Sequence, residues 1–203
     1  MMKWDAESLG LLELSSIAAG VRAGDEMMKA ARVQLLEAIP ISSGKFLVIV
    51  AGGVAEVEAS LEAGKRAAGS SIVDELRLAT VHPDVPGAIA RPRGEQAMRT
   101  SLGIVETTTV AAAIIGADAA AKAADVQLLE IAPGRGIGGK GFFTLTGDVA
   151  SVQAGAEAAR AIIDRRGAHL RSEVLAGPHP AIRERIGRML MGPFERLSED
   201  EWQ

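Results

Sequence analysis

The chain has 203 residues, of which 48% are hydrophobic and 24% charged, proportions typical of globular proteins and not of disordered or fibrous ones. Its formal net charge of -4, with basic residues scattered along the sequence, argues against a nucleic-acid-binding protein. The sequence lacks an apolar run long enough for a spanning helix and the apolar N-terminal stretch of a signal peptide. Because it also has no Cys for disulfides, we expect a cytoplasmic protein.

Signatures of catalysis are missing from the sequence. The absence of Cys excludes thiolate metal ligands and cysteine nucleophiles, and His82, His169 and His179 show no spacing typical of metal ligands. Paired-carboxylate motifs and the nucleophile motifs of known enzyme classes are also absent. These observations predict a protein that is not an enzyme and that holds no metal or cofactor.

Strand-like and helix-like patterns alternate along the first half of the chain. Short apolar runs predict strands at residues 9–14, 33–39, 46–50 and 72–79. Helical spacing separates the first two runs, and again the last two. The predicted order is strand, helix, strand, strand, helix, strand, which is the split βαβ arrangement.

The first predicted helix has one apolar face, and the same face returns in the second half of the chain. Such a face is typical of a helix that packs against other elements. The five positions at steps of three and four are Ile17, Val21, Gly24, Met28 and Ala31 in the first half, and Val110, Ile114, Ala117, Ala121 and Ala124 in the second. For the later helices, Asp148 is a predicted N-cap, and Gly69 and Gly167 stand where helices are expected to end.

An internal repeat accounts for this recurrence. The segment SLGLLE, which starts at Ser8, returns as SLGIVE at Ser101, an offset of 93 residues. Inserted residues raise the offset to 95 (Gly44 to Gly139) and then to 97 (His82 to His179). A repeat of this length indicates a duplicated domain.

We therefore predict an α+β fold with two tandem split-βαβ, ferredoxin-like domains, each a small antiparallel sheet with helices. The predicted boundaries are 1–83 for the first domain, 84–100 for a linker, and 101–203 for the second domain with a C-terminal helix and tail.

The repeated segments resemble the bacterial microcompartment shell domain. Each copy opens with Leu-Gly, two hydrophobic residues and Glu, and continues with a small-residue helix carrying Asp-x-x-x-Lys-Ala-Ala. A Gly-Lys pair and a His-Pro pair then recur in both copies. In this order, twice over, the segments resemble the unpermuted tandem form of the family.

The resemblance implies a structural shell protein of a bacterial microcompartment in the cytoplasm. Six wedge-shaped domains close a ring, so chains with two domains each would form a homotrimer that is a pseudohexamer. Such trimers tile facets beside other shell proteins, with neither nucleic acid nor membrane as a partner. The family has an edge lysine at the end of the first helix, matched here by Lys29 and Lys122. A solvated lysine at a helix end is the alternative.

The family arginine that often precedes Pro-His near the end of a domain is missing here. Thr80 and Gly177 stand nearby instead. Edge contacts are therefore expected to differ in detail from those of the family.

The resemblance also implies a central pore at the turn between the second and third strands. Serine hydroxyls donate and accept hydrogen bonds, so a ring of them suits small polar metabolites without imposing a charge. Ser and Gly are ordinary turn formers too, which leaves a plain turn as the alternative. The predicted pore-lining residues are Ile41, Ser42, Ser43 and Gly44 in the first copy, and Arg135, Gly136, Ile137 and Gly138 in the second.

One tandem member of the family carries a Cys in this turn, and three copies of it bind an iron–sulfur cluster. Ser42 stands at the matching position. A hydroxyl is a far poorer ligand for such clusters than a thiolate. We therefore predict an iron-free pore that serves diffusion of metabolites.

Two other functions can be weighed against a shell protein. The stretch from Gly134 to Gly139 fits G-x-G-x-x-G, but nucleotide-binding motifs lead into a helix, and a strand-like run at residues 142–145 follows here. A ferredoxin-like ligand-binding regulatory protein would also use duplicated split βαβ domains. It would form small discrete oligomers, whereas a shell tile would form layers.

Overall fold

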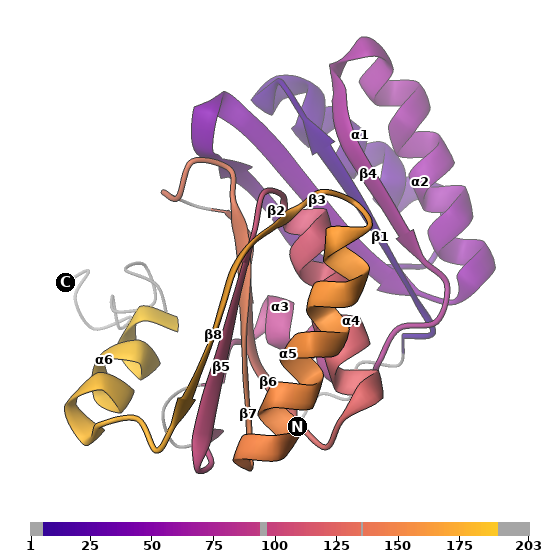
Figure 1. Ribbon diagram of the computed structural model, residues 1–203. Helices are drawn as coiled ribbons and strands as arrows, with labels where there is room; N and C mark the ends of the chain where they lie inside the picture. Colours follow the sequence, from indigo (N-terminus) through magenta and orange to yellow (C-terminus); the bar gives the residue numbers. More distant parts are fainter. Residues whose placement is uncertain (1–5, 94–96, 135, 191–203) are drawn as a thin grey trace, which may run out of the picture.

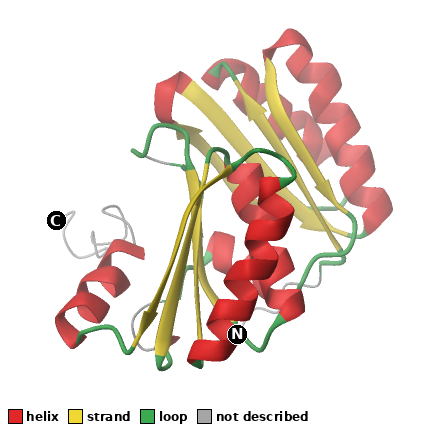
Figure 2. Cartoon of the chain, in the orientation of Figure 1, coloured by secondary structure: helices red, strands yellow, loops and turns green. Residues whose placement is uncertain are grey.

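The computed structural model describes residues 6–93, 97–134 and 136–190. They form two four-stranded antiparallel sheets, each with two helices on one face (Figure 1). Both sheets have the same strand order, β2-β3-β1-β4 in the first and β6-β7-β5-β8 in the second. The predicted α+β fold with two split-βαβ units is therefore confirmed (Figure 2).

The first unit follows the predicted order of elements. A short helical turn at Ser42–Gly44 joins β2 to β3. The elements are β1 (Ser8–Leu14), α1 (Ile17–Ala30), β2 (Gln34–Ile41), β3 (Lys45–Gly52), α2 (Val54–Ala68) and β4 (Ile72–Leu78).

The second unit repeats this order and adds a helix at its end. The elements are β5 (Ser101–Thr107), α4 (Val110–Ala123), β6 (Gln127–Ala132), β7 (Gly141–Gly147), α5 (Val149–Asp164), β8 (His169–Ala176) and α6 (Pro180–Leu190). Between the units, the segment predicted as a linker contains helix α3 (Asp84–Ala90), which the sequence patterns did not indicate. None of the described helices is long and apolar enough to cross a membrane.

Local chemistry explains where the helices begin and how closely they pack. The side chains of Ser16, Thr109 and Asp148 accept hydrogen bonds from backbone N–H groups in the first turns of α1, α4 and α5, as N-caps do. The predicted cap at Asp148 is thereby confirmed. A Cβ at Gly116 would lie 2.4 Å from the side-chain tip of Ile163, so glycine lets α4 approach α5 closely without displacing that side chain.

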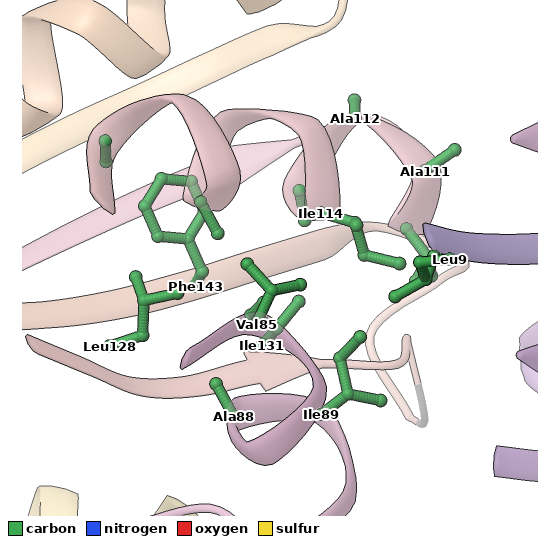
Figure 3. Packing of buried hydrophobic residues seen from close by; sticks show 14 of the residues in the cluster. Leu9, Val85, Ala88, Ile89, Ala111, Ala112, Ile114, Leu128, Ile131 and Phe143 are labelled. Carbon is green, nitrogen blue, oxygen red and sulfur yellow. The ribbon is translucent and has the colours of Figure 1, made fainter. Parts of the chain in front are cut away.

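Helices and sheets alternate in layers through the molecule. In Figure 1, α1 and α2 cover one face of the first sheet, and α4 and α5 lie between the two sheets. We call the face of each sheet that lies away from its own two helices the outer face. The outer face of the first sheet contributes Leu9, Leu11, Leu47 and Ile49 to one hydrophobic cluster with α3, α4 and the second unit's core. This shared cluster joins the two units, and its close packing is shown in Figure 3.

The apolar face predicted for the first helix has different surroundings in the two units. On α4, Val110, Ile114 and Ala121 are buried, with exposed fractions of 1%, 0% and 8%. On α1, the matching Ile17, Val21 and Met28 are 47%, 57% and 38% exposed. The residues that α1 buries against its own sheet and α2 are Gly20, Ala23, Gly24 and Met27. The predicted apolar face of α1 is thus left largely uncovered within one chain.

Candidate functional site

The two turns predicted to line a pore lie side by side. The hydroxyl of Ser42 donates a hydrogen bond of 3.2 Å to the backbone carbonyl of Gly134, across 92 positions of sequence. The ammonium of Lys45 also approaches the second turn, 3.9 Å from where a Cβ on Gly139 would lie. Each domain therefore contributes its β-turn to the same place on the molecule.

Backbone conformation explains the residue types in these turns. Ser43 and Gly44 have φ values of 65° and 72°, and Gly134, Gly136 and Gly138 have φ between 68° and 79°. This left-handed region is accessible to glycine without strain and is unusual for other residues. The glycine-rich sequence of the second turn thus reflects its shape. The G-x-G-x-x-G motif leads into strand β7 and not into a helix, so the geometry needed for phosphate binding is lacking.

The predicted pore residues differ in their exposure. Ser43, Gly44, Gly136, Ile137 and Gly138 are exposed, and Ser42 is half-buried. Ile41, the last residue of β2, is buried in the hydrophobic cluster between the domains. Arg135 lies outside the described residues.

An ion pair that the sequence patterns did not single out lies beneath the first turn. The ammonium of Lys45 is 2.7 Å from a carboxylate oxygen of Glu13, whose side chain is almost fully buried. Charged side chains are rarely buried without a partner, because desolvation costs several kcal/mol. The pair therefore fixes Lys45 beside both turns. The recurring Gly-Lys motif was its only signal in the sequence.

The junction between the domains includes a polar contact made by the C-terminal part of α4. Asp118, which is buried, accepts a hydrogen bond of 2.7 Å from the backbone N–H of His82. Lys122 pairs with Asp118 at 2.6 Å and donates a second hydrogen bond to the carbonyl of Thr80. The recurring His-Pro and Asp-x-x-x-Lys motifs therefore come together between domains. We call this contact, together with the apolar packing of α4 on the outer face of the first sheet, the seam.

The matching residues of the first domain are not engaged in this way. Asp25 and Lys29 pair with each other on α1, where both side chains are more than half exposed. On the other side of the repeat, Gly177 and His179 match Thr80 and His82, and both are exposed. Each chain therefore has one complete seam and two unmatched halves.

The outer face of the second sheet has a cavity at the positions that match the covered part of the first sheet's outer face. A cavity of about 440 Å³ lies over β5 and β7, lined in part by Ile104, Phe142, Thr144 and Ile186. The hydroxyl of Thr144 is buried and makes no hydrogen bond among the described residues. In the first sheet, the matching residues Leu11, Leu47 and Ile49 are fully buried by the second domain. The hollow is thus the counterpart of a filled interface.

A buried carboxyl group adjoins this hollow. Glu130 on β6 lies opposite Thr144 on β7, and one of its oxygens is buried without a hydrogen-bond partner among the described residues. Desolvation by burial raises the pKa of Glu130 to about 8. The carboxyl group is therefore largely protonated at neutral pH. Among the described residues, no group of three or more acidic or histidine side chains is placed to hold a metal ion.

Comparisons with known proteins agree with this architecture. The model of the BMC domain matches twice, at residues 8–83 and 101–178. The bacterial microcompartment shell protein PduT of Citrobacter freundii is 38% identical over 177 residues, which are 87% of this chain and 96% of PduT. The carboxysome shell protein CcmK2 of Synechococcus elongatus is 40% identical over 82 residues, which are 38% of this chain and 80% of CcmK2.

A solved structure gives the same result for the fold. The crystal structure of a microcompartment protein from Desulfitobacterium hafniense is similar with a TM-score of 0.82 and 46% sequence identity. The match covers 87% of this chain and 97% of that one. These relatives are shell proteins and not enzymes, which confirms the prediction of a structural protein over a ligand-binding regulator. The chain therefore belongs to the BMC-domain family of bacterial microcompartment shell proteins, as a member with two such domains in tandem.

Proposed function

We propose that three copies of this shell protein close a ring, in which every domain meets the next through a seam like the one within the chain. The observation that carries the proposal is the contrast in burial between matching residues of the two domains. Ile114 is fully buried in the seam, whereas Val21, its match on α1, is 57% exposed. An apolar stripe of this kind on a surface helix indicates a surface that is covered in the assembly.

The complementary surface is the hollow outer face of the second sheet. In the ring, α1 of one chain packs over Ile104, Phe142 and Thr144 of the next, beside Ile186 of α6, which already lines one side of the hollow. This contact corresponds to the packing of α4 over the first sheet. The buried hydroxyl of Thr144 then lies within an interface that can supply a partner. Contacts between two different surfaces generate closed rings when the rotation closes, and with two domains per chain a six-domain ring needs three chains.

The polar part of the seam is available for the same contact. By the repeat, Asp25 takes the place of Asp118 and accepts a hydrogen bond from the backbone N–H of His179 of the next chain. Lys29 takes the place of Lys122 and donates to the carbonyl of Gly177. All four groups are exposed in the single chain, so no contact within the chain has to be broken.

The pore of the ring is formed by alternating turns of the two domains. The hydrogen bond between Ser42 and Gly134 shows how two turns meet within one chain, and the ring repeats this junction around its axis. Serine hydroxyls and glycine backbone then line the passage, with Lys45 held behind them by Glu13. Such a lining favours small polar metabolites, which exchange water for hydrogen bonds with the turns.

The outer ends of the seams lie at the edges of the ring. Lys29 and Lys122 remain 64% and 41% exposed at the ends of α1 and α4. We assign them to contacts between neighbouring rings, so that rings tile a facet beside other shell proteins. Each lysine thus contributes to a seam within the ring and also contacts the neighbouring ring.

Native mass spectrometry combined with electron microscopy tests the assembly. The expected particle contains three chains of 21.1 kDa and associates laterally into hexagonal layers. A species that remains monomeric at all concentrations and forms no layers would contradict the proposal.

Cysteine cross-linking tests the pore separately. Because the chain has no Cys, Ser42→Cys supplies a single thiol per chain, and three thiols around one axis should react with one trifunctional maleimide. The expected product is a covalent trimer on a denaturing gel. Ser70→Cys, an exposed position at the end of α2, is the control and should give mostly single chains. Equal cross-linking of both variants would place Ser42 away from the axis.

A further inference from the structure

The two sides of the seam carry two apolar residues, Ile115 and Leu76, whose matches in the repeat are charged. Helix α4 contacts β4, where Ile115 packs on the hydrophobic cluster that contains Leu76. The residue of α1 that matches Ile115 is Arg22, at the offset of 93, and the residue of β8 that matches Leu76 is Glu173, at the offset of 97. Pairing positions confirm the second match, because Leu76 lies opposite Leu11 and Glu173 lies opposite Ile104. Two apolar residues at one cluster thus correspond to two residues of opposite charge in the other half of the repeat.

Within the described part of the single chain, Arg22 has no ionic partner and Glu173 pairs with the exposed Arg171. Arg22 is exposed on α1 and makes no ion pair within the described part of the chain. Glu173 is 52% exposed, whereas Leu76 is only 5% exposed. Exposed charges of this kind contribute little to the stability of one chain.

Glu173 retains room for a second cation. Arg171 donates two hydrogen bonds to it, and both end on the same oxygen, Oε1. Its other oxygen, Oε2, can therefore accept a hydrogen bond from another guanidinium. A carboxylate between two guanidinium groups is a strong arrangement, because hydrogen bonds between charged groups are about twice as strong as neutral ones.

We propose that Arg22 of one chain pairs with Glu173 of the next chain and so makes the seam between chains chemically different from the seam within a chain. The proposal rests on the ring proposed above and names the residues that select its partners. Helix α4, with Ile115 at this position, is already packed in the seam of its own chain. Helix α1 of the next chain therefore brings Arg22, and pairs the remaining oxygen of Glu173. The pair therefore favours strict alternation of first and second domains around the ring.

Selection of this kind depends on penalties against wrong partners as well as on attraction to the right one. Covering a carboxylate with an apolar side chain removes water from it without any compensation. A second copy of this same chain, placed head to tail, brings Arg22 to the carboxylate that Arg171 already contacts through its other oxygen.

Charge reversal with rescue tests the proposal. Arg22→Glu and Glu173→Arg should each raise the concentration needed for half-maximal trimer formation by about tenfold, as reversals at electrostatic interfaces do. The double variant restores opposite charges and should return this concentration to within about threefold of the wild-type value. Native mass spectrometry across a dilution series measures all three.

A matched control and a second pair of substitutions distinguish failure of the proposed ion pair from failure of the proposed ring. Arg66→Glu reverses an exposed arginine on α2, away from the stripe, and should leave trimer formation unchanged. Arg22→Ile combined with Glu173→Leu copies the seam within the chain, and its assembly should depend less on salt than that of the wild type. If both single-reversal variants form trimers as readily as the wild type, or if the double variant does not restore trimer formation, the pairing of Arg22 with Glu173 is wrong although the ring proposal stands. A monomeric wild type would overturn the ring itself.

Discussion

Helices α1 and α4 have the same place in two copies of one domain, yet their surroundings differ. Both carry an apolar stripe followed by Asp and Lys at a spacing of four. On α4 the stripe is buried under the first sheet, and Asp118 is bonded to His82. On α1 the stripe and Asp25 are exposed. One residue pattern therefore encodes the same interface between domains in both copies. In the second copy this interface is filled within the chain, and in the first copy it is exposed and available to a neighbouring chain.

The largest contrast is expected when a charge is placed in each stripe. Ile114→Asp buries a carboxylate in the seam, which should lower the free energy of unfolding by more than about 4 kcal/mol. Val21→Asp should change it by less than about 0.5 kcal/mol, because the site is exposed in one chain. The same Val21→Asp variant should no longer form trimers. Urea unfolding and native mass spectrometry distinguish the two effects, and a trimeric Val21→Asp variant would contradict the account.

The free energy of unfolding should depend on pH through Glu130 in the second sheet. Burial raises the pKa of this carboxyl to about 8, above its unfolded value of 4.5. Between these values the folded state holds a proton that the unfolded state has released, so stability falls as pH rises and is greatest below the unfolded pKa. The decrease between pH 5 and pH 8 should be on the order of 3 kcal/mol.

The control for this pH dependence is Glu130→Gln, which cannot ionise. Urea unfolding of the variant should show a flatter profile over the same range. If the wild-type and variant profiles are parallel, Glu130 does not titrate in the folded protein as its burial indicates.

A smaller contrast is expected at the two aspartates. Asp118→Ala removes the acceptor for the backbone N–H of His82 and the partner of Lys122, which should cost about 2 kcal/mol of unfolding free energy. Asp25→Ala removes only an exposed pair with Lys29 and should cost below about 0.5 kcal/mol in the single chain. Equal losses in thermal or urea unfolding would show that the two positions are not matched halves of one contact.

The smallest effect on folding is expected at Lys29. Lys29→Ala removes an exposed ammonium group that contributes less than about 1 kcal/mol, whereas the Lys122→Ala change made with it leaves the buried carboxylate of Asp118 without its cation and should cost about 1–3 kcal/mol. Rings should therefore persist, while layers that repeat the edge contact many times should disperse. Electron microscopy shows the layers and native mass spectrometry shows the rings. Parallel loss of both levels of assembly would argue against an edge role for these residues.

Much of the fold followed from residue patterns, because the repeat doubled every weak signal. Thr144 and Thr146 alternate with Phe143 and Leu145, and the structure places the first pair on the outer face and the second pair in the core. Helix α3 was missed because its sequence, DVPGAIA, contains both Pro and Gly and is only 7 residues long. Its burial between the domains is what stabilises it.

The candidate site was predicted only in part. The turn residues were named from the resemblance, and the hydrogen bond between Ser42 and Gly134 brings the two turns together. The different environments of Lys29 and Lys122 could not be predicted, since both stand in the same Asp-x-x-x-Lys-Ala-Ala motif. Their difference arises from Thr80, which lies 42 positions from Lys122 and reaches it only through the packing of two domains.

The most direct test of the account is a structure of the assembled protein by electron cryomicroscopy, at a resolution that shows side chains. Threefold rings are expected, in which Val21 is buried on the second sheet of the next chain and Asp25 accepts a hydrogen bond from the backbone N–H of His179. Rings in which α1 faces solvent, or assemblies that join the chains through another surface, would contradict it.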